Sequence, residues 1–262
     1  MVFATHDGAL PDAGRTLLHW LAGWWRIVHL GALVLVLAAS PGSYTRARRA
    51  ALARHVVEST APALPWFGVL SALLSLVVIR IVLVTAVSYG LSQYALEMMV
   101  RVLVLELIPL AAALFGALRC TMPHGADIAA LRAASGEGDS IPVLRGEVLP
   151  RVLAGVFAVL MLAAVSCVLT LVLAYLSVYG FTLAGWAGYT HTVGHVFGPA
   201  VSLIFVLKIV FFSIAVTLIP IASVLDDRPR AATRMSAEMQ GLVRMFIVIF
   251  LIEAASLAGN YA

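Results

Sequence analysis

The amino-acid sequence predicts an all-α integral membrane protein with five transmembrane helices and a further helix near the N-terminus. Of its 262 residues, 62% are hydrophobic and 11% are charged, whereas soluble domains average about 45–50% apolar and about 25% charged residues. So few charges cannot cover a soluble fold of this size, and the mean hydropathy is +1.03. The charges are also spaced so that uninterrupted apolar stretches reach the roughly 20 residues that a bilayer crossing needs.

The apolar stretches define the domain organisation. We expect residues 59–262 to form a five-span domain and residues 1–58 to form a cytoplasmic N-terminal segment. The expected spans lie at about 59–89, 93–118, 152–176, 200–225 and 242–257. The second and third are joined by a cytoplasmic connection at about 119–150, and the third and fourth by a periplasmic connection at about 177–199.

The N-terminal segment contains a short apolar run at 27–40, too short to cross a bilayer comfortably. Asp7 and Asp12 precede it, which does not fit the basic start of a signal peptide. Apolar residues recur at helical spacing at Leu17, Leu21, Trp24 and Val28. We therefore expect an amphipathic helix over about 15–39 that lies in the cytoplasmic interface of the membrane.

The basic residues predict the orientation. Sixteen of the seventeen are Arg, and those outside the spans gather before the first span, between the second and third, and between the fourth and fifth. The other connections and the C-terminal tail carry no Arg or Lys. Cytoplasmic loops are enriched in these residues, so we expect a cytoplasmic N-terminus and a periplasmic C-terminus.

Several classes of activity lack the residues they need. The only lysine, Lys208, does not follow a glycine, so the chain has no P-loop for ATP. The pI near 9.4 is explained by membrane orientation, and we expect no nucleic-acid partner. His191 and His195 are four residues apart without a third ligand nearby, and Cys120 and Cys167 are interpreted as small packing residues. We expect no metal, no cofactor and no enzymatic activity, although a metal-dependent membrane enzyme using the two histidines stays an alternative.

Charges at membrane depth are costly and normally face the interior of a bundle or a wet cavity. Six fall at membrane depth: Arg80, Glu97, Arg101, Glu106, Lys208 and Glu253. Glu97 and Arg101 have the spacing of a helical ion pair, which is either a structural pair or a polar lining for a lipid head group. Arg80 either snorkels to the periplasmic surface or belongs to the lipid route.

Glu106 and Lys208 are the charges with the fewest local partners. Pro109 lacks an amide hydrogen and should free a carbonyl group near Leu105, which would open a kink beside Glu106. Arg101 is the candidate cation for Glu106. Lys208 lies too deep to snorkel, so we expect it to pair with an acid, for which Glu253 is the candidate, or to face a phosphate group.

Five local sequences, in this order, resemble the MlaE/YrbE permease family. They are Tyr89-Gly90, Glu106-Leu107-Ile108-Pro109, Leu149-Pro150-Arg151-Val152-Leu153-Ala154, Leu207-Lys208 and Glu253. The resemblance covers about residues 15–258. It implies the membrane subunit of an ABC-type transporter that moves phospholipid between the inner membrane of a Gram-negative bacterium and a periplasmic MCE protein. It also implies three partners, which are a second permease copy (the same chain or a paralogue), cytoplasmic ATPase subunits that hydrolyse ATP, and a hexamer of MCE domains.

Two tasks receive candidate residues, of which Glu106 matches the family pattern while the apolar walls are chosen from their positions in the spans. Substrate would be bound by Glu106, Arg101, Glu97, Lys208 and Tyr89 and by apolar walls that include Leu70, Leu74, Val78, Met98, Val102 and Phe246. Coupling to the ATPase would use the residues Arg119, Glu137, Asp139, Arg145 and Arg151.

The sequence also departs from the family pattern. Ile108 replaces a glycine, Leu105 replaces an arginine, and the coupling segment is shortened and interrupted by Gly136, Gly138 and Pro142. These departures motivate an alternative function, a membrane anchor of an MCE complex that no longer transports lipid.

Overall fold

The computed structural model describes residues 9–40, 46–121, 146, 148–225 and 234–261. These residues are almost entirely helical and contain no strand, which confirms the predicted all-α class. Five segments are long and apolar enough to cross a membrane, as the sequence predicts: Arg49–Ser88, Ala95–Arg119, Leu149–Tyr179, Pro199–Ala222 and Met239–Asn260.

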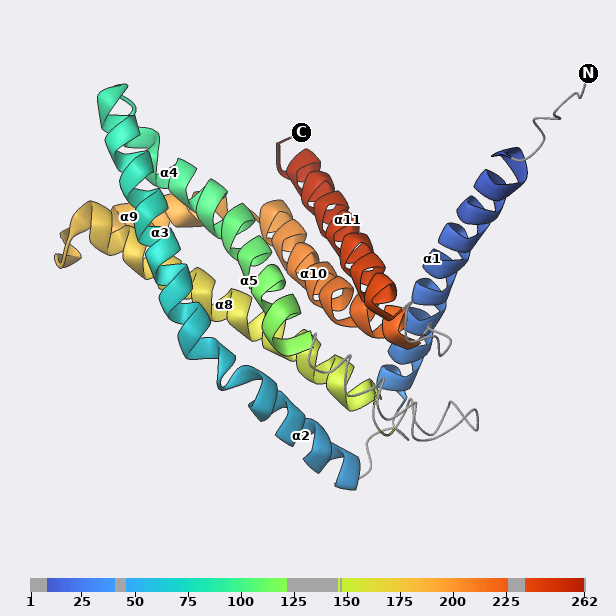
Figure 1. Ribbon diagram of the computed structural model, residues 1–262. Helices are drawn as coiled ribbons and strands as arrows, with labels where there is room; N and C mark the ends of the chain where they lie inside the picture. The colour runs from blue at the N-terminus through green and yellow to red at the C-terminus, as the bar shows by residue number, and fades with distance from the viewer. Residues whose placement is uncertain (1–8, 41–45, 122–145, 147, 226–233, 262) are drawn as a thin grey trace, which may run out of the picture.

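The N-terminal part forms two helices. Helix α1 (Ala9–Ala39) runs across the direction of α10 (Pro199–Leu225) and α11 (Arg234–Tyr261), as Figure 1 shows. It packs on the bundle through buried Ile27, Val34 and Leu37, which share a cluster with residues of α10. The two helices approach closely at this crossing, because a Cβ at Gly31 would lie only 2.9 Å from a methyl group of Leu218, which would have to shift.

Helix α2 (Arg46–Thr60) was not expected as a separate element. It leads into α3 (Ala63–Ser88) with only Ala61 and Pro62 between them, so the first span has a helical extension. Figure 1 shows α2 continuing the course of α3, and α2 packs along α8.

Two outer turns are built alike. Helix α3 ends at Tyr89 and Gly90, and α8 (Leu149–Tyr179) ends at Gly180. Gly90 has a φ of 71° and Gly180 a φ of 68°, values that a side chain disfavours. Each turn is followed by one short 3₁₀ turn and then a new helix.

The second span is broken into helical segments of different pitch. It begins with a 3₁₀ turn (Ser92–Tyr94) and the short helix α4 (Ala95–Met99). A π-helix, η3 (Val100–Leu107), follows, then α5 (Ile108–Gly116) and a second π-helical turn (Ala117–Thr121). The whole span is more enclosed than the first and fifth spans, since half of its most apolar stretch is buried. The second span and α10 therefore lie at the centre of the bundle, while most of the first and fifth spans is not covered by other helices of the chain.

The third and fourth spans are joined by helix α9 (Trp186–Val196) rather than by the irregular connection expected at 177–199. The reason is a cluster of aromatic rings with centroids 5.1–6.4 Å apart, formed by Tyr175, Tyr179, Trp186 and Tyr189. The Tyr189 hydroxyl donates to the carbonyl oxygen of Leu171 at 2.7 Å. Burial and the nearby Tyr179 raise the pKa of Tyr189 to about 12, so this donor keeps its proton.

Small polar groups join the spans without formal charge. Ser75 of α3 and Thr170 of α8 share a buried hydrogen bond of 2.8 Å. The buried Cys167 lies 3.8 Å from the carbonyl oxygen of Val104, as expected of a small packing residue. Such contacts let helices approach closely where lipid supplies no hydrophobic force between them.

Candidate functional site

A single lysine lies at the centre of a charged network buried between three spans. The side chain of Lys208, on α10, is only 1% exposed. Its ammonium group contacts the Glu106 carboxylate of η3 and lies 2.9 Å from Glu253 Oε2 of α11. It also donates to the carbonyl oxygen of Leu105 at 3.1 Å. The predicted pairing of Lys208 with Glu253 is therefore confirmed.

The Leu105 carbonyl is available because of Pro109. A helical amide at position 109 would bond to the carbonyl four residues earlier, which is that of Leu105, and proline has no hydrogen to donate. The chain widens into a π-helix just before the proline, so that the amide of Ile108 reaches back five residues to Leu103. The freed carbonyl then accepts from Lys208, which confirms the prediction made for Pro109.

One member of the network was missed by sequence reasoning. Asn260 Nδ2 donates to Glu106 Oε1 at 3.3 Å. It lies seven residues after Glu253, two helical turns along the same face of α11, and this spacing was the available signal. The predicted fifth span ended at about residue 257, so Asn260 fell in the C-terminal tail and had no predicted role.

One expectation about this network was wrong. Arg101 does not supply the cation for Glu106, because Lys208 does so from a helix about one hundred residues away in the chain. Of the two alternatives for Lys208, the structure shows pairing with an acid. Its ammonium group donates to the Leu105 carbonyl oxygen and to the Glu106 carboxylate, and it forms an ion pair with Glu253.

Glu97 and Arg101 form the expected local pair. Arg101 Nε and Nη2 each lie 3.0 Å from Glu97 Oε1. Their side chains are 32% and 28% exposed, against 13% for both Glu106 and Glu253. This second charged site thus lies nearer the surface of the chain than the Lys208 network does.

The other predicted substrate residues are not among the described side chains that contact Lys208. Tyr89 is exposed at the outer end of α3, Leu70 is exposed on the same helix, and Leu74 and Val78 are half-buried there. All of them lie along α3 or at its C-terminal end.

The residues expected to couple the chain to an ATPase are only partly described. Arg119 is exposed at the end of the second span, and Arg151 is half-buried near the start of α8. Glu137, Asp139 and Arg145 lie outside the described residues. Among the described residues there is no group of three or more His, Cys, Asp or Glu side chains that could hold a metal ion, and His191 and His195 lie one turn apart on α9.

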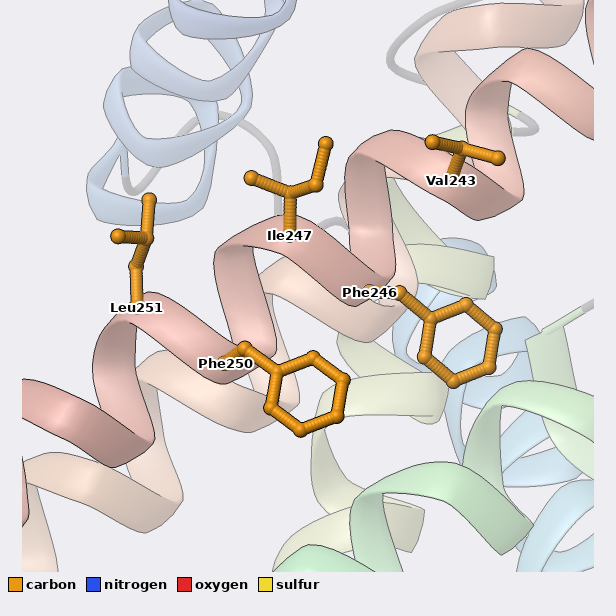
Figure 2. A pocket seen from close by; sticks show the side chains of 5 residues that line it. All are labelled: Val243, Phe246, Ile247, Phe250 and Leu251. Carbon is orange, nitrogen blue, oxygen red and sulfur yellow. The ribbon is translucent and has the colours of Figure 1, made fainter.

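An apolar groove of about 410 Å³ lies along α11. Figure 2 shows two rows of side chains that line it, with Phe246 and Phe250 on one side of the helix and Val243, Ile247 and Leu251 on the other. Phe246 was one of the apolar walls expected from the sequence. The same helix turns Glu253 toward Lys208, so α11 has one apolar outer face and one charged inner face.

Five apolar spans enclosing a charged network define a multi-pass membrane protein. The family model described as Permease MlaE matches residues 52–258, from the first span to the last turns of the fifth. The chain therefore belongs to the MlaE permease family, and it is a membrane permease by that membership. No curated protein matches the sequence.

Proposed function

We propose that the chain is the permease subunit of an ABC-type phospholipid transporter in the inner membrane of a Gram-negative bacterium. The observation that carries this proposal is the family match, which covers all five spans. The distribution of arginine supports an N-terminus in the cytoplasm and a C-terminus in the periplasm. ATP is hydrolysed by separate cytoplasmic subunits, because the chain lacks a P-loop, and a hexameric MCE protein receives or delivers the lipid outside.

The apolar groove on α11 is proposed as a wall of the lipid path. Its lining is entirely hydrophobic, as acyl chains require, and it opens to one side of the chain. A second permease copy, identical or a paralogue, closes this side and makes a cavity between the two subunits. Glu97, Arg101, Glu106 and Tyr89 supply the polar contacts for a head group.

The geometry changes the role we assign to Lys208. Because its ammonium group contacts two carboxylates and a backbone carbonyl from three spans, its proposed role is to position α10, α11 and the π-helix relative to one another. A movement of α11 that reshapes the groove must therefore carry Glu253 with it or break its contact with Lys208. Coupling to the ATPase runs through the cytoplasmic connection, with Arg119, Arg151, Glu137, Asp139 and Arg145 as the proposed contacts.

Co-purification in mild detergent, followed by reconstitution, tests this function. We expect an ATPase subunit and an MCE protein to remain bound, and ATP to drive transfer of a labelled phospholipid between proteoliposomes and the MCE protein. Glu106→Gln should reduce transfer, whereas Glu58→Gln, a change of the same kind on the exposed side of α2, should not. Retention of the MCE protein without any ATPase would instead establish the anchor function.

A further inference from the structure

The outward face of α3 is an apolar stripe with one charge in its middle. Exposed side chains recur every three or four residues along it, at Trp66, Leu70, Leu73, Val77, Arg80, Val84 and Val87. The opposite face is buried in the bundle through Phe67, Ser71, Ser75, Ile79 and Ala86. Arg80 is exposed and falls three residues after Val77 and four before Val84, so it belongs to the outward stripe.

Arg80 has no acidic partner in the part of the chain that the structure describes. Each acid of the neighbouring spans is already engaged, since Glu97 pairs with Arg101 while Glu106 and Glu253 contact Lys208. An arginine cannot escape its charge by losing a proton, because its guanidinium group stays protonated in proteins. A bare guanidinium among lipid-facing aliphatic side chains is costly.

Arg80 also lies deep within the span. It precedes Ser88, the last residue of α3, by eight residues, which is about 12 Å along a helix at 1.5 Å per residue. The exposed Tyr89 follows directly, and tyrosine is enriched at membrane interfaces. The Cα atom of Arg80 therefore lies well below the membrane interface, and snorkelling can bring the guanidinium group only part of the way to water. A bound anion stabilises the buried charge more than this partial snorkelling does.

We propose that Arg80 binds the phosphate group of a phospholipid in the outer leaflet, with the acyl chains of that lipid lying along the apolar stripe of α3. The planar guanidinium fork matches two phosphate oxygens at once. The flanking Val77 and Val84 are exposed apolar side chains of a predicted span, a setting that favours a lipid phosphate over a free anion as the ligand. This site exists whether or not the chain transports lipid.

Native mass spectrometry of the full chain tests the proposal. The protein is titrated with dioleoyl-phosphatidylglycerol, and in parallel with dioleoylglycerol, which has the same chains without a phosphate. We expect one phosphatidylglycerol to bind at least about fivefold more tightly to the wild-type protein than to Arg80→Gln, and Arg80→Lys to lie between them. Leu203→Gln, a polar change at an exposed position of α10 outside this stripe, should leave binding unchanged.

Several results would overturn this site. Equal phosphatidylglycerol binding by the wild-type protein and Arg80→Gln would do so, as would equally tight binding of dioleoylglycerol. Displacement of the lipid by inorganic phosphate would show a site for a free anion. If Arg80→Gln converted a dimer into monomers without changing lipid binding, the partner of Arg80 would be a second copy. None of these measurements needs an ATPase or an MCE protein, so their outcome is independent of the transport assay.

Discussion

The second span carries two charged sites, the Glu97–Arg101 pair and Glu106, which differ in how their charges are compensated. Glu97 and Arg101 compensate each other within one helix, four residues apart, and about a third of each side chain stays exposed. Glu106, only five residues further on, depends on α10 and α11 for its cation and for the amide of Asn260. The same residue types therefore make a local, partly solvated pair in one place and a tertiary, buried one in the other. Removal of a partner should accordingly cost little at the first site and much at the second.

The largest effect is expected when the sign of the central charge is reversed. Lys208→Glu alone would place a third carboxylate beside Glu106 and Glu253, and we expect a loss of at least about 3–5 kcal/mol in the free energy of unfolding. Adding Glu253→Lys returns a cation to the network and should recover part of the loss. Thermal unfolding of the purified protein in detergent measures both variants. A double variant no more stable than Lys208→Glu would show that the two side chains are not coupled.

A smaller loss is expected for Glu253→Gln. Lys208 and Glu106 would then stay balanced, and Lys208 loses one of its two ion-pair partners, for which we expect about 1.5–3 kcal/mol. The same unfolding measurement applies, with Glu58→Gln on α2 as the control. A loss as large as that of Lys208→Glu would mean that both carboxylates are equally essential to the fold.

Asn260→Ala should cost less again. It removes a single neutral donor from Glu106 while the contact of Glu106 with Lys208 remains, so we expect about 1 kcal/mol. Asn260→Asp, which replaces the donor by a further carboxylate, should be clearly worse than Asn260→Ala. Equal stability of the two variants would place Asn260 outside the network.

The smallest effect is expected at the local pair. Arg101→Gln leaves Glu97 in a partly solvated position, and we expect a change of about 0–1 kcal/mol. If this variant also weakened lipid transfer while its stability stayed unchanged, the pair would be part of the head-group path. A loss comparable with that of Lys208→Glu would remove the distinction between the two sites.

Features that depend on neighbours along the chain were predictable. The five spans follow from apolar length, the Glu97 and Arg101 pair from a spacing of four, and the free carbonyl of Leu105 from the missing hydrogen of Pro109. Helix α9 was not predicted, because it depends on the packing of Tyr189 against the aromatic rings and backbone of α8, which lie close only in the folded chain. The pairing of Glu106 was predicted with the wrong cation for a related reason, since Arg101 is near in sequence and Lys208 is near only in space.

By itself, the sequence determined that this chain resides in a membrane, how many times it crosses, and which few charges must be sheltered there. These properties follow from the cost of placing polar groups in hydrocarbon, which acts on each segment separately. Only the tertiary structure decided which charges meet. Lys208 could pair with an acid on any neighbouring span, and the packing of α10 against α11 and the π-helix brought two carboxylates to one ammonium group. It also left Arg80 exposed on the outward face of α3, away from the acidic side chains of the described residues.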